Sequence, residues 1–316
     1  MQLTYAFCTY NRATRLPGLV RAMRLQECPI PFEILAVNNN SQDATLAVLQ
    51  ELARAEGVPL RVVTESRQGI AHARNRALEE AMNSDYLIFI DDDELPAPGL
   101  LRAAVESLEQ EGADCVGGRV QVAFGAGLRP SWLTDELLPF MAETDYGATA
   151  FWVQDRDQPM WTANIGYRMQ IFRDDPSLRF DIRSNRVGHS IGGGEDVRMF
   201  EAWFDRGHRI RYRPDMLVEH HVDAARLQRS YFWRIHYAAG QKRGRYTMAE
   251  YDRHWFGIPL FLVRQACGRA LQSLLAALGG NSRFMRTSMN FTYALGVLHG
   301  RLLAQRDRKA KVESSL

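Results

Sequence analysis

The sequence predicts an α/β protein whose sheet is mostly parallel and flanked by helices. Four short apolar runs recur within the first 90 residues, and a plausible helix follows each run. The runs are residues 3–7, 33–37, 60–64 and 86–90. Strands that alternate with helices form βαβ units, whose ligands bind beyond the carboxyl ends of the strands. The residues directly after each run are therefore the first candidates for a binding site.

Helical patterns lie between and after these runs. Residues 44–56 form one such pattern, and Ser41 and Asp43 just before it are good N-cap residues. After residue 93 the regularity fades. There the sequence predicts helices over 98–111 and 195–205 and strands over 115–122 and 209–212. Before residue 93 it also predicts a helix over 70–82.

Composition favours a folded protein with one catalytic domain and a tail, because 46% of the 316 residues are hydrophobic and 24% are charged. Four scattered cysteines show no spacing typical of zinc sites or disulfide frameworks, so we expect reduced thiols. No basic segment precedes the first run, and Arg264 and Arg269 interrupt the most apolar stretch. We therefore expect a cytoplasmic protein without a spanning helix.

Charge is distributed unevenly along the chain. Residues 1–222 carry 23 Lys and Arg against 32 Asp and Glu, whereas residues 223–316 carry 16 against 5. Two apolar stripes at helical spacing lie in the basic part. The first is Val263, Cys267, Leu271, Leu274 and Leu278, and the second is Phe291, Leu295, Leu298 and Leu302. A basic amphipathic tail fits an anionic membrane surface, and packing against the catalytic domain or a second subunit is the alternative.

The strongest local signal is a run of acids at the end of an apolar strand. Asp91, Asp92, Asp93 and Glu94 directly follow residues 86–90. Carboxylates this close repel one another, and a divalent cation is the usual reason to keep them together. Mg²⁺ or Mn²⁺ fits, since both favour carboxylate, water and phosphate oxygens. The alternative is a solvated acidic turn that caps the next helix.

Three further polar turns follow the other strands. Asn11 and Arg12 stand after the first strand, where backbone amides and these side chains could hold a nucleotide. A second polar turn covers residues 37–43. In the third, Gly69 opens a helix on which Arg74 could meet a pyrophosphate or brace the acidic cluster. Considered alone, ordinary helix capping explains the first turn about as well and the second turn better. A solvated helix face explains the third about as well.

Two later motifs carry candidate acids and histidines. Residues 192–194 are glycines that deliver Glu195 and Asp196 to the start of a helix. A carboxylate at a helix N-terminus stays ionised, as a general base must, although simple capping by Asp196 is the alternative. His220 and His221 follow a short strand, and an imidazole there could complete a metal site made by distant carboxylates.

Taken in order, these turns resemble the family 2 glycosyltransferases of the GT-A fold over roughly residues 2–225. The matching segments are TYNR (9–12), NNNSQD (38–43), GIAHARN (69–75), DDD (91–93), FD (180–181), GGGED (192–196) and RPDMLVEHHV (213–222). The resemblance implies an inverting enzyme that moves a sugar from a nucleotide-diphosphate sugar to an acceptor hydroxyl in cell-envelope polysaccharide or glycolipid synthesis. It also implies a GT-A sheet with a C-terminal helical extension.

The same resemblance implies roles for individual residues. Asp196 would be the catalytic base with Glu195 as its neighbour, and Asp93 and His220 would hold the metal. The residues that would bind the nucleotide sugar are Thr9, Asn11, Arg12, Asn39, Asp43, Arg74, Asp91 and Asp92. Family members usually have Asp where this chain has Asn38 or Asn39, so the contact to the base is altered here. A UDP-sugar is the favoured donor.

The resemblance also sets the expected domains. Residues 1–225 would form the catalytic domain, with a nucleotide-binding half over 1–95 and an acceptor half over 96–225, and residues 226–316 would form the tail. The aromatic segment 125–161 would help to hold a saccharide or lipid-linked acceptor. Two alternatives are a noncatalytic sugar-binding or scaffolding protein and a nucleotidyltransferase. A nucleotidyltransferase normally has a glycine-rich phosphate loop after the first strand, and residues 8–12 lack one. The basic tail contains no recognisable nucleic-acid-binding motif, so we expect no nucleic-acid partner.

Overall fold

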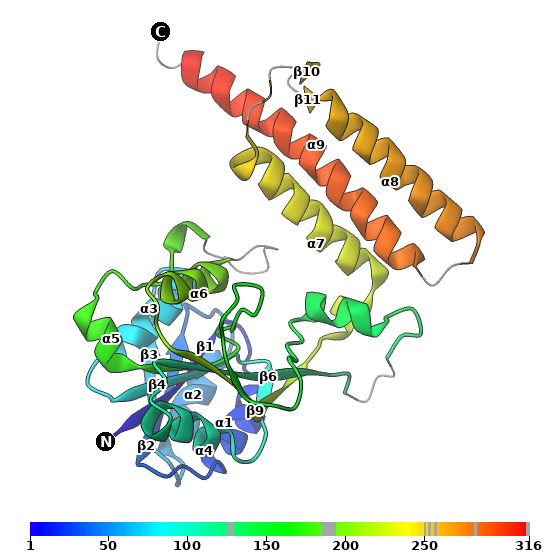
Figure 1. The fold of residues 1–316 in the computed structure, drawn as a ribbon. Coiled ribbons are helices and arrows are strands. Elements are labelled where there is room, and N and C mark those ends of the chain that lie inside the picture. Colours follow the sequence, from blue (N-terminus) through cyan, green and yellow to red (C-terminus); the bar gives the residue numbers. More distant parts are fainter. Residues whose placement is uncertain are drawn as a thin grey trace. The chain divides into compact units, whose positions relative to one another are not determined.

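The computed structural model describes residues 1–125, 129–184, 194–249, 251, 254–255, 258–280 and 283–313 (Figure 1). The chain divides into two compact units. Residues Met1–Gly125 and Met141–Val222 form the first, which we call the sheet unit. Residues Ala126–Phe140 and Asp223–Leu316 form the second, the helical unit. The segment Ala126–Phe140 thus belongs with the C-terminal helices although it lies far from them in the sequence.

The sheet unit is built on a nine-stranded mixed sheet, counted over its described residues, with the strand order β3-β2-β1-β4-β8-β6-β9-β5 and β7 paired to β9. Strands β3, β2, β1 and β4 are parallel, whereas β8 and β5 run antiparallel to their neighbours. The strands are β1 Leu3–Thr9, β2 Phe32–Asn38, β3 Leu60–Thr64, β4 Tyr86–Ile90, β5 Glu94–Pro96, β6 Cys115–Ala123, β7 Phe151–Trp152, β8 Asn164–Arg168 and β9 Ile210–His221. The predicted α/β fold with a mostly parallel sheet and C-terminal helices is confirmed.

Helices cover both faces of this sheet (Figure 1). Side chains alternate along β1, so that Tyr5 and Phe7 enter one core and Ala6 and Cys8 enter the other. Helices α1 (Leu16–Arg24), α2 (Thr45–Arg54) and α4 (Leu100–Val105) supply buried side chains to the first core, and α3 (Ile70–Glu80), α5 (Met169–Asp174) and α6 (Glu195–Asp205) supply them to the second. The carboxyl ends of the central strands therefore open between two helical layers.

Two elements differ from their predicted forms. The helix predicted over 98–111 is α4 followed directly by a π-helical turn, Glu106–Gln110. The strand predicted over 209–212 is much longer, because β9 continues to His221. Pro214 would normally end a strand. Here the pairing of β9 with β6 skips from Arg213 to Leu217, so the proline falls in a bulge and the strand resumes beyond it.

The helical unit contains three long helices: α7 (Arg229–Lys242), α8 (Leu260–Leu278) and α9 (Phe284–Glu313). Glycines bring α7 and α9 into backbone contact. A Cβ added at Gly240 on α7, or at Gly244 in the π-helical turn Arg243–Thr247 that follows it, would lie 2.1–2.2 Å from a backbone oxygen of α9. One at Gly296 or Gly300 would meet α7 equally closely. Only residues without a Cβ allow this approach.

The two predicted apolar stripes do not form the packing surface of these helices. Val263, Leu271 and Leu278 are exposed, and so are Leu295 and Leu302 in the second stripe. Small side chains take the packing positions on α8 instead, including Ala266, Ser273 and Ala276. Among the described residues, no helix is both long enough and apolar enough to span a bilayer.

We expect two helical glycines to respond to alanine in opposite directions. Gly240→Ala should lower the free energy of unfolding by about 3 kcal/mol or more, because its Cβ would force α7 away from Tyr293 O. Gly268→Ala should raise it by about 0.5–1 kcal/mol, since no atom lies near that Cβ and alanine favours a helix. Thermal and denaturant unfolding would measure both. Equal effects would contradict the close packing.

Candidate active site

The predicted acidic cluster lies at the carboxyl end of β4. Strand β4 is buried along its whole length, and the chain leaves it at Asp91. Glu94 then opens β5, which pairs with β9 so that Glu94 stands opposite His220. The pairing places His220 Nε2 3.6 Å from Asp93 Oδ2, and the His221 backbone N–H donates to the Asp93 carbonyl at 2.9 Å. Residues 127 positions apart in the chain therefore meet at one edge.

The tautomer of His220 follows from its second contact. Its Nδ1 lies 2.8 Å from the Met141 carbonyl oxygen, which can only accept a hydrogen bond, so Nδ1 carries the proton. In the neutral ring, Nε2 then presents a lone pair toward the Asp93 carboxylate. Two acceptors that face each other need a cation or a second proton between them. Such a pair of carboxylate and oriented imidazole fits a divalent metal.

The described residues offer no group of three or more His, Cys, Asp or Glu side chains that could hold a metal ion alone. Asp93 and His220 could supply two ligands. Mg²⁺ in proteins is commonly held by one or two side chains, with water and substrate phosphate oxygens completing its shell. The donor set therefore fits a metal that binds together with a nucleotide diphosphate.

Burial and crowding perturb the neighbouring acids. Desolvation, reinforced by the Asp93 charge, raises the pKa of Asp92 to about 7. Desolvation, with the charges of Asp91 and Asp93, also raises the pKa of Glu94 well above its ordinary value. Arg12 opposes the first of these shifts, because its Nε lies 3.9 Å from Asp92 Oδ1. Arg12 therefore offsets the raised pKa of Asp92 only in part.

Arg74 is the cation at the other side of the cluster. Its side chain is 4% exposed and contacts three carboxylates. The guanidinium donates to Asp91 Oδ1 at 3.1 Å, to Glu195 Oε1 at 3.0 Å and to Asp196 Oδ1. It also lies 5.7 Å from the centre of the Phe180 ring. The sequence left open whether Arg74 meets a pyrophosphate or braces the acidic cluster. In this geometry it braces the acids.

Asp196 is held by a hydroxyl as well as by Arg74. The Thr162 hydroxyl, which is buried just before β8, donates to the same Asp196 Oδ1. The sequence predicts that a helix N-terminus keeps this carboxylate ionised. The structure instead raises its pKa to about 6, because desolvation and the Glu195 charge outweigh the stabilisation by Arg74 and Thr162. No motif pointed to Thr162, whose only sequence signal is its place before a short strand.

The glycines that precede Asp196 are only partly described. Gly192 and Gly193 lie outside the described residues. Gly194 has φ +118°, a left-handed conformation that favours glycine, and α6 begins directly after it. The tight turn lets Glu195 and Asp196 reach Arg74 from the first turn of the helix.

The turns after β1 and β2 are joined to each other. Asn11 adopts a positive φ of 53°, and its Oδ1 accepts the Gln42 backbone N–H at 2.8 Å. Its own N–H donates to Ser41 Oγ at 3.0 Å, and the Arg12 N–H donates to Thr45 Oγ1 at 2.9 Å. Together with buried Thr9 at the end of β1, these turns make a continuous polar rim at the edge of the sheet.

Asp43 ends this rim at the start of α2. Its Oδ1 accepts the Thr45 N–H at 2.9 Å and so caps the first turn of the helix. Burial raises the pKa of Asp43, but hydrogen bonds from the backbone and the side chain of Thr45 outweigh burial and lower that pKa. Ser41, the other predicted cap, bonds Asn11 instead.

Asn39 shows why an amide replaces the usual aspartate. Its Nδ2 donates to the carbonyls of Glu65 and Arg67 at 3.2 and 2.8 Å, and its Oδ1 accepts the Gly69 N–H at 2.7 Å. The side chain is buried and ties β2 to the loop before α3. An aspartate could accept from Gly69, but it could not donate to the two carbonyls.

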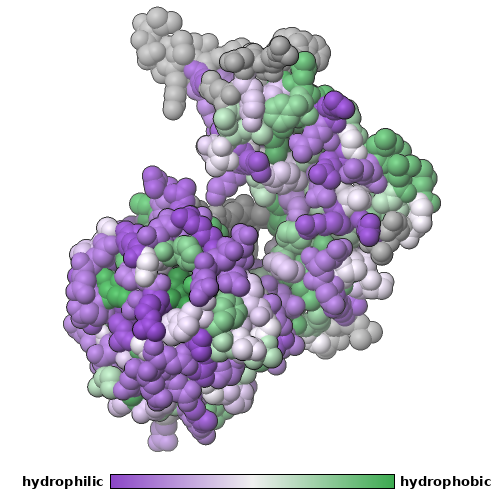
Figure 2. All heavy atoms as spheres, in the orientation of Figure 1, coloured by the Kyte–Doolittle hydropathy of each residue, from purple (hydrophilic) through white to green (hydrophobic). Residues whose placement is uncertain are grey.

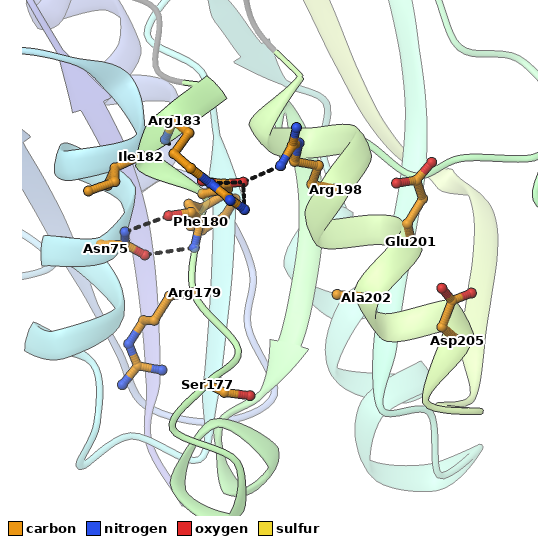
Figure 3. Close-up of a pocket in the computed structure, with 11 residues that line it drawn as sticks. Asn75, Ser177, Arg179, Phe180, Ile182, Arg183, Arg198, Glu201, Ala202 and Asp205 are labelled. Carbon is orange, nitrogen blue, oxygen red and sulfur yellow. Dashed lines mark hydrogen bonds and ion pairs between the residues drawn. The ribbon is translucent and has the colours of Figure 1, made fainter. Parts of the chain in front are cut away.

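A cavity of about 630 Å³ lies between α3 and α6, and neither Arg74 nor the carboxylates that it contacts line it (Figure 3). Asn75 fixes its wall, because its side chain exchanges hydrogen bonds of 2.9 and 2.8 Å with the Phe180 backbone. Arg183 and Arg198 both pair with Asp181 and hold the pKa of that carboxyl far below its usual range. The lining is Asn75, Ser177, Arg179, Phe180, Asp181, Ile182, Arg183, Arg198, Glu201, Ala202 and Asp205.

The aromatic side chains of segment 125–161 pack within their own units. In the helical unit, Trp132 contacts the Phe232 ring at 5.4 Å and Phe140 contacts His236 at 4.5 Å. In the sheet unit, Arg209 lies over the Trp152 ring at 4.4 Å. Acceptor binding by this segment stays a prediction.

The model of glycosyl transferase family 2 matches residues 6–189, which is more than half of the chain. The chain belongs to glycosyl transferase family 2. The glycosyltransferase YfnE of Bacillus subtilis is 33% identical over 111 residues, which are 35% of this chain and 28% of YfnE. The succinoglycan biosynthesis protein ExoM of Rhizobium meliloti is 25% identical over 78% of this chain and 75% of its own length. This family 2 chain thus spans little more than a quarter of YfnE and three quarters of ExoM.

Solved structures show the same GT-A fold. The mannosyltransferase PcManGT from Pyrobaculum calidifontis, in complex with GDP-Man and Mn²⁺, has a TM-score of 0.61 at 17% identity over 93% of this chain and 85% of its own. TarS 1-349 of S. aureus, in complex with UDP-GlcNAc, has a TM-score of 0.55 at 17% identity over 94% and 90%. For this family 2 member, both confirm the predicted architecture.

We expect Asn39→Asp to destabilise the sheet unit although the family resemblance implies an aspartate at Asn38 or Asn39. The carboxylate would face the carbonyls of Glu65 and Arg67, and two buried acceptors would lose their donor. A loss of about 1–3 kcal/mol in the free energy of unfolding follows. Denaturant unfolding at neutral pH would measure it, with exposed Asn83→Asp as the matched control. An unchanged stability would contradict the structural role of Asn39.

Proposed function

We propose that this chain transfers a sugar from a nucleotide-diphosphate sugar to an acceptor hydroxyl, with inversion at the anomeric carbon. The observation that carries the proposal is the contact of Arg74 with both Asp91 and Asp196. It joins the acidic end of β4 to the first turn of α6. Carboxylates suited to a metal and nucleotide then share one site with a carboxylate able to take a proton. Family membership supports the same activity.

The donor would lie along the rim formed by the strand ends. Thr9, Asn11 and Arg12 would meet the nucleotide from one side, and Asp43 would close the same pocket. Asp91 and Asp92 would approach the ribose and phosphates. We propose that Asn39 acts on the donor indirectly, by holding the loop before α3. Arg74 would balance the charge of the acids beside the diphosphate.

A divalent metal, Mg²⁺ or Mn²⁺, would be held by Asp93 and His220. When bound it would supply positive charge for the departing diphosphate. The orientation of the His220 ring by the Met141 carbonyl supports this role, because it turns Nε2 toward the Asp93 carboxylate.

The chemistry would be a single in-line displacement. Asp196 accepts the proton of the acceptor hydroxyl while that oxygen attacks the anomeric carbon. The bond between this carbon and the β-phosphate oxygen breaks, and the nucleoside diphosphate leaves with the electron pair. Thr162 and Arg74 keep the Asp196 carboxylate oriented throughout. Glu195 shares Arg74 and keeps it in place.

The donor and acceptor classes rest on the relatives. Fold neighbours are complexes with UDP-GlcNAc and with GDP-Man, so both nucleotides have precedents, and we favour a UDP-sugar. ExoM is named for succinoglycan biosynthesis, which supports a saccharide or lipid-linked acceptor in cell-envelope polysaccharide synthesis. We place this reaction in the cytoplasm or at the cytoplasmic face of the membrane. A nucleotidyltransferase would release pyrophosphate, and a noncatalytic binding protein would release nothing.

We expect Asp196→Asn to reduce kcat by about 10²–10⁴-fold, because the amide cannot accept the proton. Release of nucleoside diphosphate from the sugar donor, with lipid-linked saccharides as acceptor, would measure the change. Asp205→Asn at the other end of α6 is the matched control, since the Asp205 carboxylate pairs with Arg156 rather than with Arg74. Unchanged transfer by Asp196→Asn would remove Asp196 from the mechanism.

We expect the rate to depend on pH through Asp196. Its ionised form is the active one and its pKa is about 6, so kcat/KM should fall about tenfold per pH unit below that value. Thr162→Val removes a donor that favours the ionised form, and the acid limb should move to higher pH. Thr162→Ser keeps the hydroxyl and should restore the limb. A limb that both variants leave in place would contradict the role of Thr162.

A further inference from the structure

Helix α8 buries Leu262 and three small side chains, and it exposes most of its large ones. Ala266, Ser273 and Ala276 are buried, and the helix packs on α9. Leu271, Leu274 and Leu275 are 56–60% exposed and Leu278 is 77% exposed. We call the exposed apolar side the outer face of α8, and it comprises Leu260, Val263, Cys267, Leu271, Leu274, Leu275 and Leu278. Hydrophobic side chains gather at the C-terminal end of this helix in Figure 2.

The position of these residues follows from the period of a helix. At 100° per residue, Leu260, Leu271 and Leu278 lie within about 20° of one another and opposite the buried stripe. Arg264 is the one charged residue on this side of α8, and it is exposed. A row of exposed leucines about 28 Å long is costly in water, so a partner would be expected to cover it.

Charge indicates which partner fits. Helix α8 contains Arg264 and Arg269 and no acidic residue. Residues 223–316 carry 16 Lys and Arg against 5 Asp and Glu, whereas residues 1–222 have an excess of acids. A second copy seated on the outer face would bring two basic units together, and their repulsion opposes that contact. Anionic lipid headgroups attract the same residues, at about 1 kcal/mol for each basic side chain near the surface.

We propose that the outer face of α8 binds an anionic lipid surface. The leucines enter the boundary between headgroups and acyl chains, and Arg264 contacts the headgroup phosphates. The helix lies in the plane of the surface, since none of the helices described is suited to cross a bilayer. The proposal goes beyond the transfer reaction and does not depend on it, because vesicle binding can be measured without a donor.

The exposed Cys267 allows a direct test in the full chain. Cys8 and Cys115 are buried, so a Cys28→Ser background leaves Cys267 as the one accessible thiol for an environment-sensitive dye. With vesicles of phosphatidylcholine and phosphatidylglycerol, we expect the dye emission to shift to the blue and a lipid-borne quencher to reduce it. Vesicles of phosphatidylcholine alone should produce a much smaller shift.

Substitutions on the outer face supply the second arm. Leu271→Gln, Leu275→Gln and Leu278→Gln combined should weaken the vesicle partition coefficient by at least about tenfold, since the apolar contact is lost. These side chains are exposed, so helicity by circular dichroism should be retained. Leu25→Gln in the sheet unit, at 75% exposure, is the matched control and should bind vesicles as the parent does.

Three results would overturn the proposal. The dye would not respond to any vesicle if the outer face has no lipid affinity. If the dye emission shifts to the blue without lipid, and the shift grows with protein concentration, a second copy covers the face. A blue shift without lipid at every protein concentration would show that the chain's own residues cover it.

Discussion

The buried guanidinium of Arg74 is the interaction on which the candidate active site depends. It contacts Asp91 from the end of β4 and both Glu195 and Asp196 from the first turn of α6. Three carboxylates this close could not all remain ionised without a cation, because burial and mutual repulsion both favour protonation. Arg74 thereby fixes the distance between the part of the site that would bind the donor and the part that would remove a proton.

The second constraint is the long strand β9. A bulge opposite Gly118 and Arg119 accommodates Pro214, and the strand then continues to pair with both β6 and β5. This pairing brings His220 to Asp93 and lets the Met141 carbonyl set the tautomer of the ring. A shorter strand would leave the histidine away from the acids. The proposed metal site therefore depends on backbone pairing more than on any local motif.

Sequence patterns located the parallel strands and the polar turns, because buried strands read as continuous apolar runs that end abruptly in polar residues. They could not locate Thr162, which acts through a single hydrogen bond to Asp196 from outside any motif. They also left open what covers α8, because an apolar stripe at helical spacing identifies a face without saying what lies against it. The glycines on α7 and α9, rather than leucines, carry the close packing there. Nothing in the sequence explained the amide at Asn39. The structure shows that this amide donates hydrogen bonds to two backbone carbonyls.

The central claim is that the acids after β4 and His220 form one metal and nucleotide site. Thermal unfolding with UDP, GDP or dTDP, each with and without Mn²⁺, tests it most directly when the protein is compared with its Asp93→Asn variant. The account predicts that one nucleotide raises the Tm only when Mn²⁺ is present and that the variant loses this increase. The absence of any nucleotide-dependent increase in the unmodified protein, or an undiminished increase in Asp93→Asn, would contradict it.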